Sequence, residues 1–302
     1  MEALLAKELV VVTGKGGVGK TTVAGALGLA AAARGRRVIV AEVAARDELA
    51  RALGAGPATP FAERTVAPGL HHVSIDPQRA MEEYLADQLP ARALADILVR
   101  SKLFTYLAAA TPGLRELLTV GKVWELAQPE RRTPGAAPYD LVVLDAPATG
   151  HGLALLDAPR TFADAARVGP ISRHGRTIHE MLTDPRRTGV VAVTAPEELA
   201  VTETLALRAA LRERHGIDLD HVVLNGELPD RFTTAEAGAL GAAGDGRAVR
   251  VARHHLRRAR AQRTQAARLR SGLEATVPVT TLPYLFCDAL GADDLRRLAE
   301  RF

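Results

Sequence analysis

A glycine-rich loop near the N-terminus has the residue types and spacing that bind phosphate. Residues 14–21 read G-K-G-G-V-G-K-T and fit the pattern G-x-x-x-x-G-K-[ST]. Backbone N–H groups in this loop can surround a phosphate, because glycine permits the tight turn and the close approach. We expect Lys20 to neutralise the β- and γ-phosphates of a nucleotide and Thr21 to bind Mg²⁺. The phosphate-binding residues we expect are Gly14, Lys15, Gly16, Gly17, Val18, Gly19, Lys20, Thr21 and Thr22.

Two further charged residues belong to this chemistry. The stretch "LVVLDAP" places Asp145 at the end of an apolar strand, where a carboxylate can hold Mg²⁺ through its water shell beside the loop. Lys15 follows the first glycine directly, although the pattern needs one lysine only. The chain has five lysines, and two of them lie in this loop. Their placement indicates a need for a compact ammonium there, which a planar guanidinium does not supply.

Composition restricts the class of protein. The chain has 302 residues, 47% of them apolar, which suits one large or two small globular domains. No run approaches 18 apolar residues, and the N-terminus lacks the basic region of a signal peptide. Cys287 is the only cysteine, so one chain can form neither a disulfide nor a cysteine-rich zinc site. We expect a cytoplasmic protein without a transmembrane segment.

Short apolar runs alternate with helical segments along the chain. This alternation predicts an α/β fold: a parallel sheet of the phosphate-loop type, with helices on both faces. The predicted helix after the loop is 21–35, and another starts at Pro196. The predicted strands are 9–13, 37–43, 71–76, 139–147, 189–196, 220–226 and 277–283.

Two blocks interrupt the alternation within what we interpret as one domain over 1–302. Residues 76–138 read as a helical insertion whose apolar stripes are more typical of a core than of a client-binding groove. Residues 227–275 form a second helical and linker insertion, with a flexible linker expected at 238–248. At the C-terminus, Leu295, Leu298 and Phe302 share one face and predict a packed final helix.

The second block contains the positive charge of the protein. Residues 247–270 hold nine arginines and no acid, and without them the net charge of +4 would become negative. Such a segment can attract acidic lipid, nucleic acid or an acidic client. No aromatic residue is interleaved, so base stacking and hence nucleic-acid binding gain no support. The interpretation we favour is a solvated helix with a narrow seam of Val251, Leu256, Ala259 and Leu269.

These motifs together resemble the ArsA family of P-loop ATPases. G-K-G-G-V-G-K-T-T is the deviant Walker A sequence of the MinD/ParA/ArsA group, and "DAPATGH" (145–151) is similar to the second switch of the ArsA family. "APEELAVTET" (195–204), "VVLNGELP" (222–229) and "LPYLFCDALG" (282–291) resemble three further family segments. The likeness runs from residue 9 to the C-terminus, and among ArsA-like proteins it favours the actinobacterial homologues that often occur as paired paralogues.

The resemblance implies roles for particular residues. It implies that Lys15 reaches across a dimer interface to the partner's nucleotide, as an arginine finger does. It implies that Lys20 and Asp145 complete the catalytic site, and that Asn225 and Pro283 bind adenine. The expected ligands are therefore ATP or ADP with Mg²⁺. The expected partner is a second copy of this chain or a paralogous ATPase. A protein client and peripheral contact with a membrane are further partners that the resemblance allows.

The chain departs from the family at its first switch. The family reads S-T-D-P-A-H-N-L there, whereas this chain reads "AEVAARDEL" (41–49), which puts Ala44 where the aspartate that activates water belongs. Glu42 lies two residues early and Asp47 three late, and a displacement of ~1 Å can cost ~10²-fold in rate. We therefore expect slow hydrolysis. Three alternatives stay open: Glu42 replaces the missing aspartate, Asp47 replaces it, or the chain is a non-hydrolysing regulatory subunit of a heterodimer.

The single cysteine is a second departure. Arsenite-pump members of the family bind the metalloid through thiolates, and the targeting ATPases bind a dimer zinc through a C-x-x-C pair. Soft metals require such thiolates. With Cys287 alone, neither site can be built within this chain.

Overall fold

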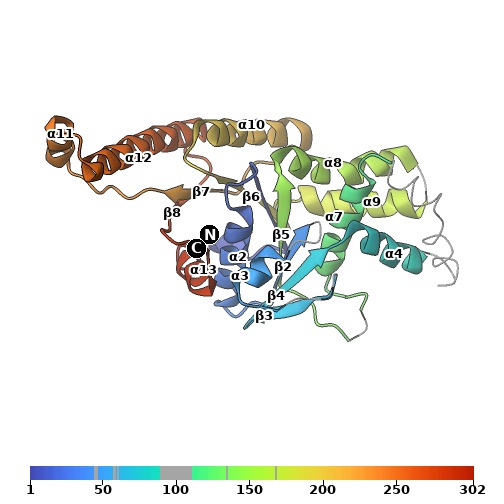
Figure 1. The fold of residues 1–302 in the computed structure, drawn as a ribbon. Helices are drawn as coiled ribbons and strands as arrows, with labels where there is room; N and C mark the ends of the chain where they lie inside the picture. Colours follow the sequence, from blue (N-terminus) through green and yellow to red (C-terminus); the bar gives the residue numbers. More distant parts are fainter. Residues whose placement is uncertain (44–46, 57–58, 60, 89–110, 134, 167–168) are drawn as a thin grey trace.

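One sheet of eight strands organises the protein in the part of the chain that the structure describes. The structure is a computed structural model, and it describes all residues except 44–46, 57–58, 60, 89–110, 134 and 167–168 (Figure 1). The strand order is β3-β4-β2-β5-β1-β6-β7-β8. The strands are β1 (Leu9–Gly14), β2 (Val38–Val43), β3 (Arg64–Ala67), β4 (Leu70–Ile75), β5 (Leu141–Ala148), β6 (Thr188–Thr194), β7 (His221–Glu227) and β8 (Val279–Pro283).

The predicted α/β class is confirmed. Every neighbouring pair of strands is parallel except β3 and β4, which are antiparallel. The edge strand β3 was not predicted, because its sequence, R-T-V-A, is short and only partly buried. The helices are α1 (Glu2–Leu5), α2 (Lys20–Ala32), α3 (Glu48–Ala52), α4 (Pro77–Gln88), α7 (Leu114–Leu126), α8 (Thr149–Ala166), α9 (Pro170–Thr183), α10 (Glu198–His215), α11 (Thr234–Ala242), α12 (Arg247–Gly272) and α13 (Ala292–Ala299).

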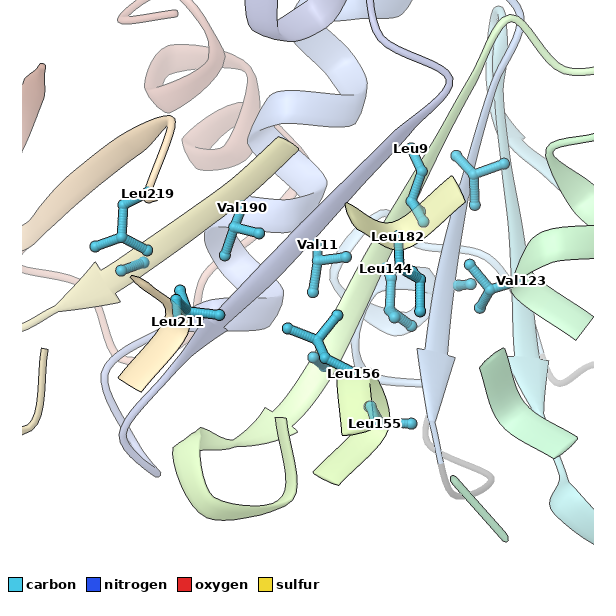
Figure 2. Packing of buried hydrophobic residues seen from close by; sticks show 14 of the residues in the cluster. Leu9, Val11, Val123, Leu144, Leu155, Leu156, Leu182, Val190, Leu211 and Leu219 are labelled. Atoms are coloured by element: carbon cyan, nitrogen blue, oxygen red, sulfur yellow. The ribbon is translucent and has the colours of Figure 1, made fainter. Parts of the chain in front are cut away.

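The central strand β1 shows why its sequence is continuously apolar. All six of its residues are buried. Leu9 and Val11 join the cluster that includes α7, α8, α10 and α12, whereas Val10 and Val12 join the cluster that includes α2 and α13. Figure 2 shows Leu9 and Val11 packed in the first of these clusters. Because helices cover both faces of the sheet, neither side of the strand can be polar.

Helices α4, α7, α8 and α9 gather at one end of the molecule (Figure 1). α4 and α7 lie in the stretch for which we expected helices, and the region around residues 94–107, with further apolar stripes, lies outside the described residues. α8 and α9 were not among the predicted elements, yet α8 packs against both α7 and α9. The helical layer at this end is therefore formed by two separate parts of the chain, one with α4 and α7 and the other with α8 and α9. The division of the chain into one domain with two insertions stays a prediction.

Helices α11 and α12 project from the opposite end as an arm (Figure 1). The flexible linker expected at 238–248 is wrong over most of its length, since helix covers 234–242 and resumes at Arg247. A capping box explains the first helix: the Thr233 side chain accepts from the backbone N–H of Glu236, whose carboxylate accepts from Thr233. This cap outweighs the four glycines and the alanine-rich sequence that indicated a linker.

The packing seam predicted for α12 is partly right. Leu256, Ala259 and Leu269 are buried as expected, but the side chain of Val251 is 63% exposed. The final helix α13 is packed as predicted, with Leu295, Leu298 and Phe302 buried against the face that carries α2.

Candidate nucleotide-binding site

The loop between β1 and α2 adopts a conformation that only glycines permit at two positions. Gly14 has φ +149°, and a Cβ there would lie 2.1 Å from the carbonyl oxygen of Val193. Gly19, the N-cap of α2, has φ +90°, and a Cβ there would lie 2.3 Å from the side-chain amide of Asn225. The loop therefore ends at a helix N-terminus whose backbone N–H groups favour an anion.

Thr21 and Asp145 meet beside this loop. The hydroxyl of Thr21 donates a hydrogen bond of 2.5 Å to Oδ2 of Asp145, which ends up there because β5 pairs with β1. The other carboxylate oxygen of Asp145, Oδ1, is buried without a hydrogen-bond partner among the described residues. A hydroxyl next to an unpartnered carboxylate oxygen suits Mg²⁺, which binds oxygen ligands and keeps waters between itself and carboxylates. The two predicted metal residues thus fit the ion.

Burial raises the pKa of Asp145 to about 6, with a further rise from the negative charge of Glu42. The hydrogen bond from Thr21 and the positive charge of Lys20 oppose that rise. Glu42 acts at close range because it is the register partner of Asp145 on the neighbouring strand β2. The negative charge of Glu42 therefore adds to the proton affinity of Asp145.

The two lysines of the loop have different surroundings. The ammonium of Lys20 donates to the backbone carbonyl of Lys15 at 3.2 Å, which places it inside the loop that it is expected to serve. The ammonium of Lys15 points to α10 instead, where it lies 3.9 Å from Oε1 of Glu203. Oε2 of the same glutamate accepts a hydrogen bond of 3.3 Å from Thr149, the first residue of α8. Glu203 was not named as a site residue, although it lies in the segment 195–204 that resembles the family, because the sequence does not show which residues it contacts.

The residues expected to bind adenine lie next to the loop. Asn225, near the end of β7, donates its side-chain N–H to the carbonyl of Val18 at 2.9 Å. Pro283 ends β8, the neighbouring strand, and lines the same cavity of about 470 Å³. Gly17, Val18, Gly19 and Thr22 form the loop side of this cavity. The structure therefore brings together residues such as Asn225 and Val18, which lie 207 positions apart in the sequence.

Several lining residues of this cavity were not predicted as site residues, among them Tyr284, Arg258 and Gln262. Tyr284 follows Pro283 directly, whereas Arg258 and Gln262 come from α12. Gln262 is buried and accepts from the backbone N–H of Leu228 at 2.8 Å. The guanidinium of Arg258 lies 5.9 Å from the centre of the Tyr284 ring. Packing of α12 against β7 brings Arg258 and Gln262 to the site.

The acids around the first switch are already engaged. Glu42 is 1% exposed, and its Oε2 lies 2.6 Å from Nε2 of His72. The same carboxylate accepts from the backbone N–H groups of Glu48 and Leu49, at 3.2 Å and 3.4 Å. Glu42 thus holds the first turn of α3 against β4, a positioning role that the sequence did not indicate.

The other displaced acid is also paired. Oδ1 of Asp47 lies 3.6 Å from the guanidinium of Arg64 on β3. Ala44 lies outside the described residues. In this arrangement both oxygens of the Glu42 carboxylate are engaged with His72 and α3, whereas Asp47 is paired through Oδ1.

Comparison with known proteins decides the family. The sequence matches the anion-transporting ATPase family, ArsA_ATPase, over residues 7–168 and 165–240, which is most of the chain. The chain belongs to this family. The resemblance inferred from the loop, the switch and the adenine segments is thereby confirmed at the level of the family.

Relatives within the anion-transporting ATPase family carry different descriptions. ATPase BagA of Mycobacterium tuberculosis is 32% identical over 224 residues, which cover 72% of this chain and 64% of the relative. An arsenical pump-driving ATPase of Acidiphilium multivorum is 28% identical over 253 residues, covering 76% of this chain and 41% of the relative. ATPase GET3B of Arabidopsis thaliana is 26% identical over 268 residues, covering 72% of this chain and 63% of the relative. The chain therefore spans less than two thirds of the length of these relatives.

Within the described ranges, no helix has the length and apolar character needed to cross a bilayer.

Proposed function

We propose that this member of the anion-transporting ATPase family binds ATP with Mg²⁺, hydrolyses it slowly and acts as a nucleotide-driven dimeric switch. The observation that carries the proposal is the contact between Thr21 and Asp145 beside the phosphate loop, with Oδ1 of Asp145 unpartnered among the described residues. Such an arrangement suits a hydrated cation that also contacts phosphate.

Each residue has a distinct task in this proposal. The loop from Gly14 to Thr22 binds the phosphates, with Lys20 as the cation in cis. Asn225 holds the loop through the Val18 carbonyl and, with Pro283, forms the adenine end. Thr21 and Asp145 hold the ion, and bound Mg²⁺ supplies charge neutralisation at the β- and γ-phosphates.

Lys15 makes the proposed switch dimeric. Its ammonium contacts Glu203 through a half-exposed pair, which is weak enough to exchange for a phosphate. In a dimer Lys15 leaves Glu203 and meets the nucleotide of the second subunit. Because Glu203 also binds Thr149 in the second switch, release of Lys15 is communicated to α8.

A second candidate function is a non-hydrolysing regulatory subunit that pairs with a paralogous ATPase. The engagement of Glu42 with His72 and α3 favours it, because that acid is then unavailable to replace the aspartate absent at position 44. This chain would then supply a cation to its partner but no general base.

Turnover by the purified chain separates the two functions. We expect hydrolysis by the wild-type chain alone, at a rate that Lys20→Ala lowers by at least 10²-fold, roughly the effect of losing a phosphate-stabilising cation. Mg²⁺-dependent ATP binding should weaken in Asp145→Ala. Binding without turnover, with turnover appearing only after a paralogue is added, would replace the first proposal by the second. Failure to bind ATP at all would overturn both.

We propose a protein as the client of this switch. The relatives are described as arsenical pump-driving ATPases in some cases and as ATPases in others, and these descriptions concern those proteins. A protein client fits a chain whose single cysteine, Cys287, cannot bind a metalloid through several thiolates.

A further inference from the structure

Two large apolar side chains are exposed between the N-terminal half of α12 and the segment that follows β8. Val251 on α12 is 63% exposed, and Phe286, which follows β8, is 61% exposed. Both line a hollow of about 680 Å³, together with Phe232, Ala248 and Ala252. An aromatic residue exposed to this extent, next to other apolar side chains in a concave surface, is typical of an interaction site.

Arginines line the rim of this hollow without being neutralised. Arg231 and Arg247 both contribute to its wall, and neither has a carboxylate within 4.0 Å in the described part of the chain. The guanidinium of Arg231 lies 4.9 Å from the centre of the Phe286 ring.

The acids nearby are committed elsewhere. Asp245 pairs with Arg253, and Asp230 pairs with Arg263. The rim therefore presents a positive charge that a docked partner could balance.

We propose that this hollow, bounded by Val251, Phe286 and Arg231, docks an acidic amphipathic helix of a partner protein. An apolar side chain of the partner enters between Val251 and Phe286, and its carboxylates face Arg231 and Arg247. Helix-in-groove recognition uses apolar anchors at helical spacing, and complementary charge selects the partner and speeds the encounter.

The shape of the site favours a protein over a bilayer or a nucleic acid. A bilayer accepts apolar side chains that protrude, whereas here they line a hollow. Stacking of nucleic-acid bases needs open ring faces. One face of Phe286 is already covered by Arg231, and the ring edge meets Tyr284 in a T-shaped contact with centroids 4.9 Å apart.

A short segment connects this hollow to the candidate nucleotide site. Pro283, Tyr284 and Leu285 line the nucleotide cavity, and Phe286 is the next residue. A nucleotide that repositions Tyr284 therefore also shifts the wall of the docking hollow. We accordingly expect docking to depend on the nucleotide, a part of the inference that rests on the proposed function.

The test uses the full chain and a fluorescein-labelled model peptide of about 16 residues, with leucines at helical i, i+3, i+4 and i+7 spacing and glutamates between them. Fluorescence anisotropy without nucleotide should show saturable binding. Phe286→Ser and the double variant Arg231→Gln/Arg247→Gln should each weaken it by about tenfold or more. Leu199→Ser is the matched control, because Leu199 is also exposed (58%) but lies at the start of α10, and it should leave binding unchanged.

Control ligands separate the alternatives. A peptide with lysine in place of glutamate, and one with serine in place of leucine, should not bind. Absence of binding by the acidic peptide, or binding that Phe286→Ser leaves intact, overturns the proposal. Two further ligands are tested in case the acidic peptide fails to bind. Sedimentation with phosphatidylcholine–phosphatidylglycerol vesicles that Phe286→Ser abolishes would assign the surface to lipid instead. Binding of a single-stranded oligouridylate that Phe286→Ser abolishes would assign it to RNA instead.

Nucleotide dependence is measured afterwards. Saturating ATP with Mg²⁺ should change the peptide affinity of the wild-type chain by at least about threefold and leave that of Lys20→Ala unchanged. An unchanged affinity in a chain that binds ATP overturns the coupling alone. Loss of peptide binding with intact ATP binding overturns docking alone, so the proposal and the proposed function fail separately.

Discussion

Lys15 and Glu203 form an ion pair, with 3.9 Å between the ammonium and the carboxylate, that joins the phosphate loop to α10. Through its second oxygen Glu203 also accepts a hydrogen bond from Thr149 at the start of α8. One carboxylate therefore contacts both the loop and the start of α8. Any displacement of Lys15 by phosphate changes the surroundings of both helices.

Removing the charge of Glu203 should favour the dimer. Glu203→Gln keeps an oxygen for Thr149 but removes the attraction that holds Lys15, so Lys15 is released more readily. A partly exposed ion pair contributes about 0.2–1 kcal/mol, which predicts ATP-dependent dimerisation up to about fivefold tighter for each pair released. Sedimentation velocity in the presence of ATP and of ADP measures the dimerisation constant. Glu213→Gln, at an exposed position of the same helix, is the control. Unchanged or weaker dimerisation of Glu203→Gln would contradict a restraining role.

Neutralising Asp145 should stabilise the protein without nucleotide above pH 6. The folded pKa is about 6 whereas the ordinary value is 3.8, so the folded state resists ionisation. The destabilisation develops as pH rises from about 4 to 6 and is complete above that range. Asp145→Asn should raise the free energy of unfolding at pH 8 by about 1–3 kcal/mol and have no such effect below pH 4. Urea denaturation at several pH values measures this, and an equal effect at all pH values would rule out titration as the cause.

The same raised pKa predicts how Mg²⁺ binding depends on pH. The ion requires the carboxylate form, so Mg²⁺–ATP affinity should fall as pH decreases through about 6. Isothermal titration calorimetry from pH 5 to 8 measures this pH dependence of the affinity. ATP without Mg²⁺ should show a smaller change over that range. Asp145→Asn should remove the pH-dependent component, and its persistence in that variant would assign the titration to another group.

Restoring the acid of the first switch should accelerate hydrolysis. Ala44→Asp places a carboxylate at the position where the family pattern has its aspartate, and general-base action contributes about 10²–10⁴-fold. Because the surrounding switch sequence also differs, we expect a rise in kcat of at least tenfold, measured by phosphate release. Ala44→Asn, of similar size without the charge, should not accelerate the reaction. A rate equal in both variants would show that base strength at this position does not limit turnover.

Glu42 should prove structural. Glu42→Ala leaves His72 and the first turn of α3 without their acceptor, and the free energy of unfolding should fall by about 2–4 kcal/mol. Glu42→Gln keeps an acceptor oxygen and should alter kcat by less than about twofold. Chemical denaturation and steady-state kinetics measure the two effects. A loss of 10²-fold or more in kcat with stability retained would instead make Glu42 the substitute base.

The sequence alone determined the features that depend on local conformation. The glycine loop, Lys20 and Thr21 at the start of α2, Asp145 at a strand end and the alternating elements all follow from steric and periodic rules that act within a few residues. The family followed from the same motifs. The packed C-terminal helix was predictable for the same reason, because Leu295, Leu298 and Phe302 fall on one helical face.

Only the tertiary structure decided which distant residues meet. The pairing of β2 with β4 and β5 seats Glu42 between His72 and Asp145, and the packing of α10 brings Glu203 to Lys15. The arginine-rich helix carries no aromatic of its own, but the segment after β8 places Tyr284 and Phe286 beside it. Such contacts depend on how whole elements pack against one another, and neither periodicity nor spacing along the chain encodes that packing.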